Sequence, residues 1–84
     1  MDINTAVKAS FSKVLKKYRS EAKMSQKELS EKSGLHRNEI GLLERKKRAP
    51  SVETIIKIAK GLEIPPKVII TGFLKELKHH IKID

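Results

Sequence analysis

Apolar residues recur at intervals of three and four along nearly the whole chain, which is the spacing of an amphipathic α-helix. Thr5 or Asn4 is expected to cap the first such stretch, because short polar side chains accept hydrogen bonds from the N–H groups of a first turn. The stretch covers roughly four to five helical turns. Its apolar stripe consists of Val7, Phe11, Val14, Leu15, Tyr18 and Ala22.

A second, shorter helix is predicted to begin at Ser25. Ser25 and Glu28 stand at the spacing of a capping box, in which each side chain satisfies a backbone N–H of the other residue. Leu29 is its main core residue. The helix is expected to stop near 32–33, because Gly34 is suited to the left-handed conformation of a C-terminal cap.

A third helix covers about 36–44, with Ile40 and Leu43 facing inward. The small residue Ser30 is expected where the second and third helices cross closely. A short helix that ends at a glycine and is followed by a steeply inclined second helix is the arrangement of a helix-turn-helix.

The remaining sequence predicts two more helices. Ser51 is expected to cap the fourth, and the fifth covers about 66–77, since proline is accepted only in a first turn. With 84 residues the chain is long enough for one domain only. We therefore predict a single all-α domain of five helices over 1–78, followed by a tail at 79–84. The stripe of the fourth helix is Val52, Ile55, Ile56, Ala59 and Leu62.

The fifth helix carries more apolar surface than one buried face can hide. One part of the arc is expected to cover the core, and the rest to pair with a second copy, because twofold dimers dominate homo-oligomers. Dimerisation would also stabilise so small a domain. The alternative is that all of these residues belong to the core of one chain. The predicted dimer interface consists of Ile64, Val68, Ile69, Ile70, Phe73, Leu74 and Leu77.

The charge favours a polyanionic partner. Lysine and arginine number 19 against 10 acidic residues, which gives a formal net charge of +9. DNA, RNA or an anionic membrane would fit this charge, and the simpler alternative is a solubilising lysine surface. With one tyrosine, two phenylalanines and no tryptophan, the chain has few rings on which single-stranded bases could stack. This shortage favours duplex recognition.

The sequence argues against catalysis and cofactors. It has no cysteine, which excludes disulfides and thiolate metal sites. It has no glycine-rich phosphate loop, and the adjacent His79 and His80 point in different directions on a helix, so no metal site is expected. We predict that the protein is not an enzyme and has neither a cofactor nor a small-molecule substrate. No apolar run is long enough to span a bilayer, and the first residues lack a signal-peptide pattern, so we expect a cytoplasmic protein with no membrane partner.

Several segments resemble the lambda-repressor-like, or Cro/repressor-type, helix-turn-helix family in order and spacing over about residues 10–64. They are MSQKELS at 24–30, SGL at 33–35, Ile40, LER at 43–45 and PSVETIIKIAKGL at 50–62. The resemblance implies a prokaryotic or phage regulator of transcription that binds a pseudo-palindromic operator in double-stranded DNA at the nucleoid. The short length and helical tail also resemble the controller proteins of restriction–modification systems.

The resemblance places the base-reading turn at the start of the third helix, at His36, Arg37, Asn38 and Glu39. An arginine such as Arg37 can donate two hydrogen bonds to guanine, and an asparagine such as Asn38 can pair bidentately with adenine. His36 is either a DNA contact or only a helix cap. Glu39 either accepts from a cytosine amine or steadies Arg37.

The resemblance also implies contacts to the DNA backbone. Gln26 would contact a phosphate and brace the recognition helix, together with Ser25. Four consecutive cations follow the recognition helix, and phosphate contact is their natural role, since it positions a protein without reading sequence. The alternative for these four is a disordered basic loop. They are Arg45, Lys46, Lys47 and Arg48.

Four further positions complete the expectations. Arg19 and Glu44 stand where the family often has a semi-buried structural ion pair. Gly41 and Leu42 depart from the family, which often has polar residues there. Leu42 either touches a thymine methyl group or packs inside.

Two other functions and one further partner remain open at this stage. The apolar fifth helix would also suit an antitoxin or another protein-binding module, and basic amphipathic helices bind membrane surfaces. An activator would contact RNA polymerase, for which Glu28 and Glu31 are candidates.

Overall fold

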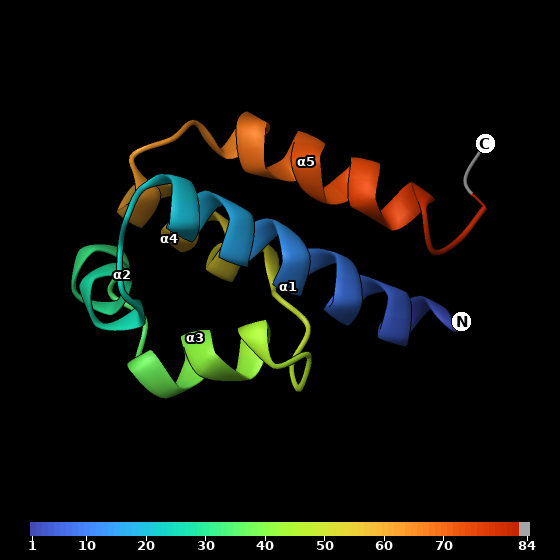
Figure 1. Cartoon of the computed structure of the whole chain (residues 1–84), viewed down its shortest axis with the longest axis horizontal. Helices are drawn as coiled ribbons and strands as arrows, with labels where there is room; N and C mark the ends of the chain where they lie inside the picture. The colour runs from blue at the N-terminus through green and yellow to red at the C-terminus, as the bar shows by residue number, and fades with distance from the viewer. Residues whose placement is uncertain (83–84) are drawn as a thin grey trace.

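The computed structural model describes residues 1–82 and consists of helices joined by short turns. The helices are α1 (Ile3–Glu21), α2 (Gln26–Ser33), α3 (Arg37–Glu44), α4 (Val52–Leu62) and α5 (Pro66–Lys78). No strand occurs within these 82 residues, so the predicted all-α fold of five helices is confirmed. In Figure 1, α1 crosses the molecule between α5 on one side and α3 on the other.

The helix starts agree with the sequence prediction at α2 and α4 but not at α1. The hydroxyl oxygens of Ser25 and Ser51 accept hydrogen bonds from the backbone N–H groups three residues on, both at 3.0 Å. Helix α1 starts earlier than predicted, because Asp2 Oδ1 accepts from the Thr5 N–H at 2.7 Å. The expectation that Thr5 or Asn4 is the cap was therefore wrong, since both lie inside the helix.

The turn between α2 and α3 is held by serine side chains. Gly34 adopts the left-handed conformation with φ of 80°. The Ser30 hydroxyl donates to the Leu35 carbonyl at 2.6 Å, and the Leu35 N–H donates to Ser33 Oγ at 3.1 Å. The Ser30 hydroxyl thus holds the turn onto α2 through a hydrogen bond.

Helix α2 packs closely against α4 at Gly61. A Cβ atom added to Gly61 would lie 2.9 Å from both Leu29 Cδ1 and Ser33 Cβ. Real Cβ atoms do not come so close, so glycine is needed where these two helices touch. Helix α2, the first helix of the helix-turn-helix, is therefore held directly against α4.

The core lies where all five helices meet. Its fully buried large side chains are Phe11, Leu15, Leu29, Ile40, Leu43, Ile58 and Ile69. The stripe predicted for α4 was partly wrong, because Val52 and Ile56 are exposed while Ile58 is buried. Residues at positions 55, 58, 59 and 62 share a single face of a helix with 3.6 residues per turn, and this face points inward.

Helix α5 covers α1, and its burial corrects part of the predicted dimer interface. Ile69 and Leu77 are buried in the core of the same chain and have no surface to offer a second copy. The Phe73 ring packs edge-on against Phe11, with 5.5 Å between the ring centroids. Ile64 is also partly buried against the core. The helix ends at Lys78 and residues 79–82 form a turn, while the last two residues of the predicted tail lie outside the described part of the chain.

Candidate nucleic-acid interface

The first turn of α3 points into solvent. His36 is its N-cap, and the ring nitrogen Nδ1 accepts a hydrogen bond from the Asn38 N–H at 3.0 Å. A neutral ring in this position carries its proton on Nε2. His36, Arg37 and Asn38 are all exposed. The structure thus gives His36 a capping role and leaves the side chains of Arg37 and Asn38 accessible to a partner.

Glu39 lies at the edge of this surface. Its Oε2 is 3.5 Å from Thr54 Oγ1, at the outer limit of a hydrogen bond, so it faces the start of α4. Among the ion pairs of residues 1–82, none joins Glu39 to Arg37. The expectation that Glu39 steadies Arg37 therefore has no contact to support it.

Gly41 gives the Arg45 side chain a place on the outer face of α3. The Arg45 guanidinium lies across this glycine, and its Nη1 is 2.9 Å from the position that a Cβ atom would take. Because residues four apart lie one above the other on a helix, Arg37, Gly41 and Arg45 follow one line. Arg45 therefore extends the polar surface that begins at Arg37. Leu42 is half-buried beside this line.

The basic loop after α3 forms a hydrogen-bonded turn. The Lys47 N–H donates to the Leu42 carbonyl at 2.9 Å, and Lys46 adopts a left-handed conformation with φ of 63°. All four cations of the loop are exposed. The turn thus presents consecutive positive charges beside α3 on an ordered backbone.

A buried carboxylate fixes α3 to its neighbours. The Glu44 side chain is 6% exposed and accepts from Arg19 Nε at 2.6 Å and from Arg19 Nη2 at 2.9 Å. Hydrogen bonding to Glu44 raises the pKa of the Arg19 guanidinium above its ordinary value, so the guanidinium stays charged. The expected Arg19–Glu44 ion pair is thus present.

The same network includes α2 and a residue that sequence reasoning missed. Gln26 Nε2 donates to Glu44 Oε1 at 3.0 Å, and Arg19 Nη1 donates to the Met24 carbonyl at 2.9 Å. The Ser12 hydroxyl donates to the Glu44 carbonyl at 2.6 Å. A serine directly between apolar stripe positions was the available sign that α1 needs a hydrogen-bond donor there. We name Arg19, Gln26, Glu44 and Ser12 the Glu44 network.

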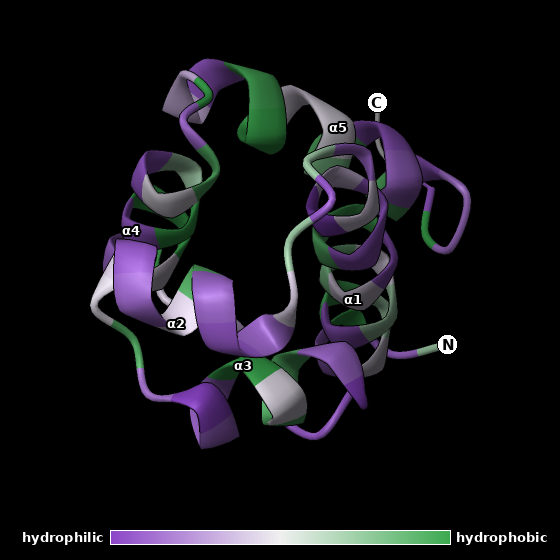
Figure 2. Cartoon of the chain, turned by 60° about the vertical axis from the view of Figure 1, so that its left-hand side comes forward, coloured by the Kyte–Doolittle hydropathy of each residue, from purple (hydrophilic) through white to green (hydrophobic). Residues whose placement is uncertain are grey.

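Helix α2 and the beginning of α3 are predominantly polar. Figure 2 shows hydrophilic residues along α2 and at the beginning of α3. Ser25 is exposed at the start of α2, where its oxygen already serves the cap. Nothing in residues 1–82 groups acidic or histidine side chains in a way that could hold a metal ion. Within the same residues, no helix is both long and apolar enough to cross a bilayer.

Comparison with known proteins gives consistent matches. The sequence pattern of the helix-turn-helix family matches residues 15–69. The control protein C.SmaI of Serratia marcescens is 42% identical over 62 residues, which are 73% of this chain and 74% of that protein.

Solved structures of the restriction–modification controller protein C.Esp1396I match most of the chain. The wild-type protein has 35% identity and a TM-score of 0.77, covering 84% of this chain and 93% of the other. The C.Esp1396I tetramer in complex with its natural 35 base-pair operator gives the same identity, TM-score and coverage.

The fold and its polar recognition helix thus define a helix-turn-helix protein of the DNA-binding class. The chain belongs to the helix-turn-helix family and, within it, to the controller proteins of restriction–modification systems.

Proposed function

We propose that this protein binds operator DNA through α3 and regulates transcription. The observation that carries the proposal is the exposed Arg37–Asn38 turn on a helix whose other end is locked by the Glu44 network. Preorganised donors are what major-groove readout requires, because a bidentate contact needs both the side chain and its helix in place. C.Esp1396I has been solved on its operator and on a 19 base-pair duplex, which supports the same partner for this chain.

With α3 placed on operator DNA, several neighbouring residues would contact the DNA backbone. Arg45, Lys46, Lys47 and Arg48 would hold phosphates beside the reading helix, and Ser25 would contribute its hydroxyl from the start of α2. Gln26 would brace α3 through Glu44, at 3.0 Å, while the second hydrogen on its Nε2 would donate to a phosphate. His36 would offer its outward Nε2–H to a phosphate or a base. Glu39 is the remaining candidate for accepting from a cytosine amine.

The dimer is proposed on the exposed apolar side chains of α4 and α5. Ile70 and Leu74 are one turn apart on α5 and are 36% and 47% exposed. Ile56 on α4, which packs against α5, is 48% exposed. Val68 lines a groove toward α1 and contributes less. A twofold dimer places two recognition helices about one DNA turn apart, or roughly 34 Å, on a pseudo-palindromic site.

Further aspects belong to the same proposal. We propose no catalysis and a location at the nucleoid in the cytoplasm. If the protein activates transcription, Glu31 on α2 is the better candidate for contacting RNA polymerase, because the Glu28 carboxylate already accepts from the Ser25 N–H.

The test is selection of bound sequences from a random duplex pool, followed by stoichiometry on the winner. We expect a twofold symmetric site that binds two chains. Tight binding at low salt without enrichment of any sequence would contradict operator recognition.

A further inference from the structure

A band of lysines crosses α1 between the turn after α3 and helix α5. These lysines line three neighbouring hollows on the surface. Two of the hollows form one groove between α1 and α5, and the third lies along α1 between Lys46 of the turn after α3 and His80 beyond α5. Lys17 lines all three, so the hollows form one continuous surface. We name as the lysine band the six lysines Lys13, Lys16, Lys17, Lys46, Lys67 and Lys75.

The lysine band is strongly positive. Glu76 is the single acidic residue among the side chains that line the three hollows. Lys13 Nζ lies 3.4 Å from Glu76 Oε2, while 68% of the Lys13 side chain stays exposed. That oxygen has no well-formed hydrogen bond within the described residues. One carboxylate therefore offsets only a small part of the charge of six ammonium groups.

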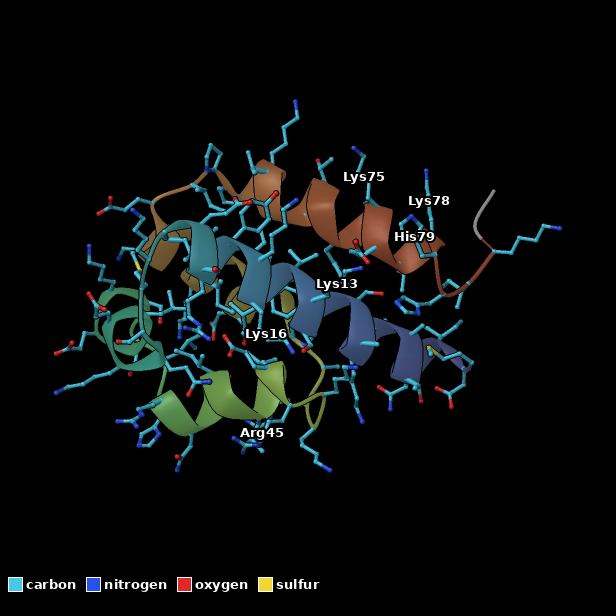
Figure 3. All side chains as sticks on the ribbon, viewed as in Figure 1. Lys13, Lys16, Arg45, Lys75, Lys78 and His79 are labelled. Carbon is cyan, nitrogen blue, oxygen red and sulfur yellow. The ribbon has the colours of Figure 1, made fainter. Side chains whose placement is uncertain are left out.

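The lysine band is continuous with the proposed DNA-binding surface. Lys46 belongs both to the basic turn after α3 and to the hollow that Lys13 and Lys16 line. In Figure 3 the labelled side chains pass from Arg45 beside α3, over Lys13 and Lys16 on α1, to Lys75 and Lys78 on α5. An extended row of cations matches the duplex backbone, which carries about one charge per 1.7 Å of helix axis.

The proposed dimer face leaves the lysine band open. Lys75 lines the groove toward α1. With 3.6 residues per turn, Leu74 and Ile70 point about 100° and 140° away from Lys75 around α5. A second copy packed on Leu74 and Ile70 would therefore not cover Lys13, Lys17 or Lys75.

We propose that the lysine band binds phosphates of the DNA that flanks the operator. Duplex beyond the half-site would be drawn from the basic turn across α1 toward α5. This inference rests on the proposed operator binding and adds a second, sequence-independent contact. Since counterion release scales with the number of phosphates neutralised, the contact makes affinity depend on both duplex length and salt.

The experiment compares two duplexes with the same selected operator, of about 20 and about 60 base pairs, the shorter covering roughly two helical turns. The test variant is Lys13→Gln/Lys17→Gln/Lys75→Gln. We expect the wild type to bind the long duplex more tightly and the variant to lose that gain. On the long duplex, the slope of log affinity against log salt falls by about 2.7 for three lost contacts, roughly a 40-fold effect over a fourfold change in salt.

The matched control is Lys32→Gln/Lys57→Gln/Lys60→Gln, which removes the same charge from α2 and α4, away from the three hollows. This control variant should still bind the long duplex more tightly than the short duplex, as the wild type does. The opposite change, Glu76→Gln, releases Lys13 and should increase that gain, which a purely structural role for these lysines would not do.

Equal losses on both duplexes, or equal losses in the test and control variants, would overturn the flanking contact. So would length-dependent bridging of two duplexes in place of tighter binding to one. If wild-type protein does not bind the short duplex at all, operator binding itself has failed. That outcome is read from the short duplex alone and is thus distinguishable from failure of the lysine band.

Discussion

Gln26 and Arg19 share one oxygen of Glu44: Gln26 Nε2 and Arg19 Nη2 both donate to Oε1, at 3.0 and 2.9 Å. The start of α2, the end of α3 and the body of α1 therefore meet at a single carboxylate. The positions of the side chains proposed to read DNA at one end of α3 depend on this anchor at the other.

Removing one partner of the ion pair should destabilise the fold. Arg19→Met leaves the Glu44 carboxylate buried without its cation, and we expect a loss of about 3 kcal/mol or more in the free energy of unfolding. Urea denaturation measures it. The exposed pair Lys32–Glu63, with 3.6 Å between its charged atoms, serves as control, since exposed pairs contribute about 1 kcal/mol or less. Equal effects at both pairs would contradict the anchoring role of Glu44.

Arg37→Ala should relax sequence specificity without affecting folding. The side chain is exposed, and a good bidentate contact to guanine contributes about 1–3 kcal/mol of discrimination. Titrations against the selected operator and against single-base variants measure the loss position by position. If affinity falls equally on operator and random DNA, Arg37 contacts phosphate only.

Substitutions of His36 should separate its role as a helix cap from a contact with DNA. Replacement by alanine removes the acceptor for the Asn38 N–H and should cost about 1 kcal/mol of stability, whereas asparagine retains a cap. Thermal unfolding of both variants tests the cap. If the asparagine variant is as stable as wild type but binds the operator more weakly, the imidazole itself contacts DNA. Equal affinities would restrict His36 to the cap.

Gly41→Ala should stabilise α3 while moving Arg45. Alanine is favoured over glycine in a helix by up to about 1 kcal/mol, and the new methyl group meets only the flexible end of Arg45. We expect a higher unfolding temperature together with weaker operator binding. Weaker binding should not appear when Arg45 is already alanine. Unchanged binding in the single variant would mean that Arg45 does not act from its position over Gly41.

Two carboxylates at helix starts should make stability depend on acid pH. The hydrogen bond from the Ser25 N–H lowers the pKa of Glu28 below its ordinary value of 4.5, and the hydrogen bond from Thr5 lowers the pKa of Asp2. A lowered folded-state pKa contributes stability above the unfolded pKa, and this is lost as pH falls through the folded value. Glu28→Gln keeps a capping partner but cannot titrate, so its unfolding free energy should fall less steeply with acid. An unchanged slope would contradict the assignment.

Most of the fold could be predicted from local sequence patterns, because helix caps and helical periodicity arise from interactions between residues that are close in the sequence. The capping box at Ser25, the left-handed Gly34 and the helical periodicity each depend on residues within a few positions of one another. The stripe of α4 was partly wrong because Val52 and Ile56 satisfy helical spacing as well as Ile58 does. Only packing against the other helices decides which of these faces is buried.

The candidate site also contains features that the sequence indicated and features that it did not. The resemblance indicated Arg19 and Glu44 from their family positions, and the structure brings them together. The hydrogen bond from Ser12 to the Glu44 carbonyl spans 32 positions, so the serine in the apolar stripe of α1 gave no indication of its acceptor. The sequence likewise could not show which apolar residues of α5 are buried and which are exposed, because burial of Ile69 and exposure of Leu74 depend on how α5 lies on α1.

The contact of Gly61 with Leu29 and Ser33 has a consequence for the spacing of the DNA half-sites that the proposed dimer would bind. Because the Gly61 backbone lies against the side chains of Leu29 and Ser33, with no room for a side chain of its own, α4 packs directly on α2. In the proposed dimer through α4 and α5, this close packing would hold the two α3 helices at one fixed distance from each other. Such a dimer would bind half-sites at one helical phase and lose affinity when a few base pairs are inserted between them.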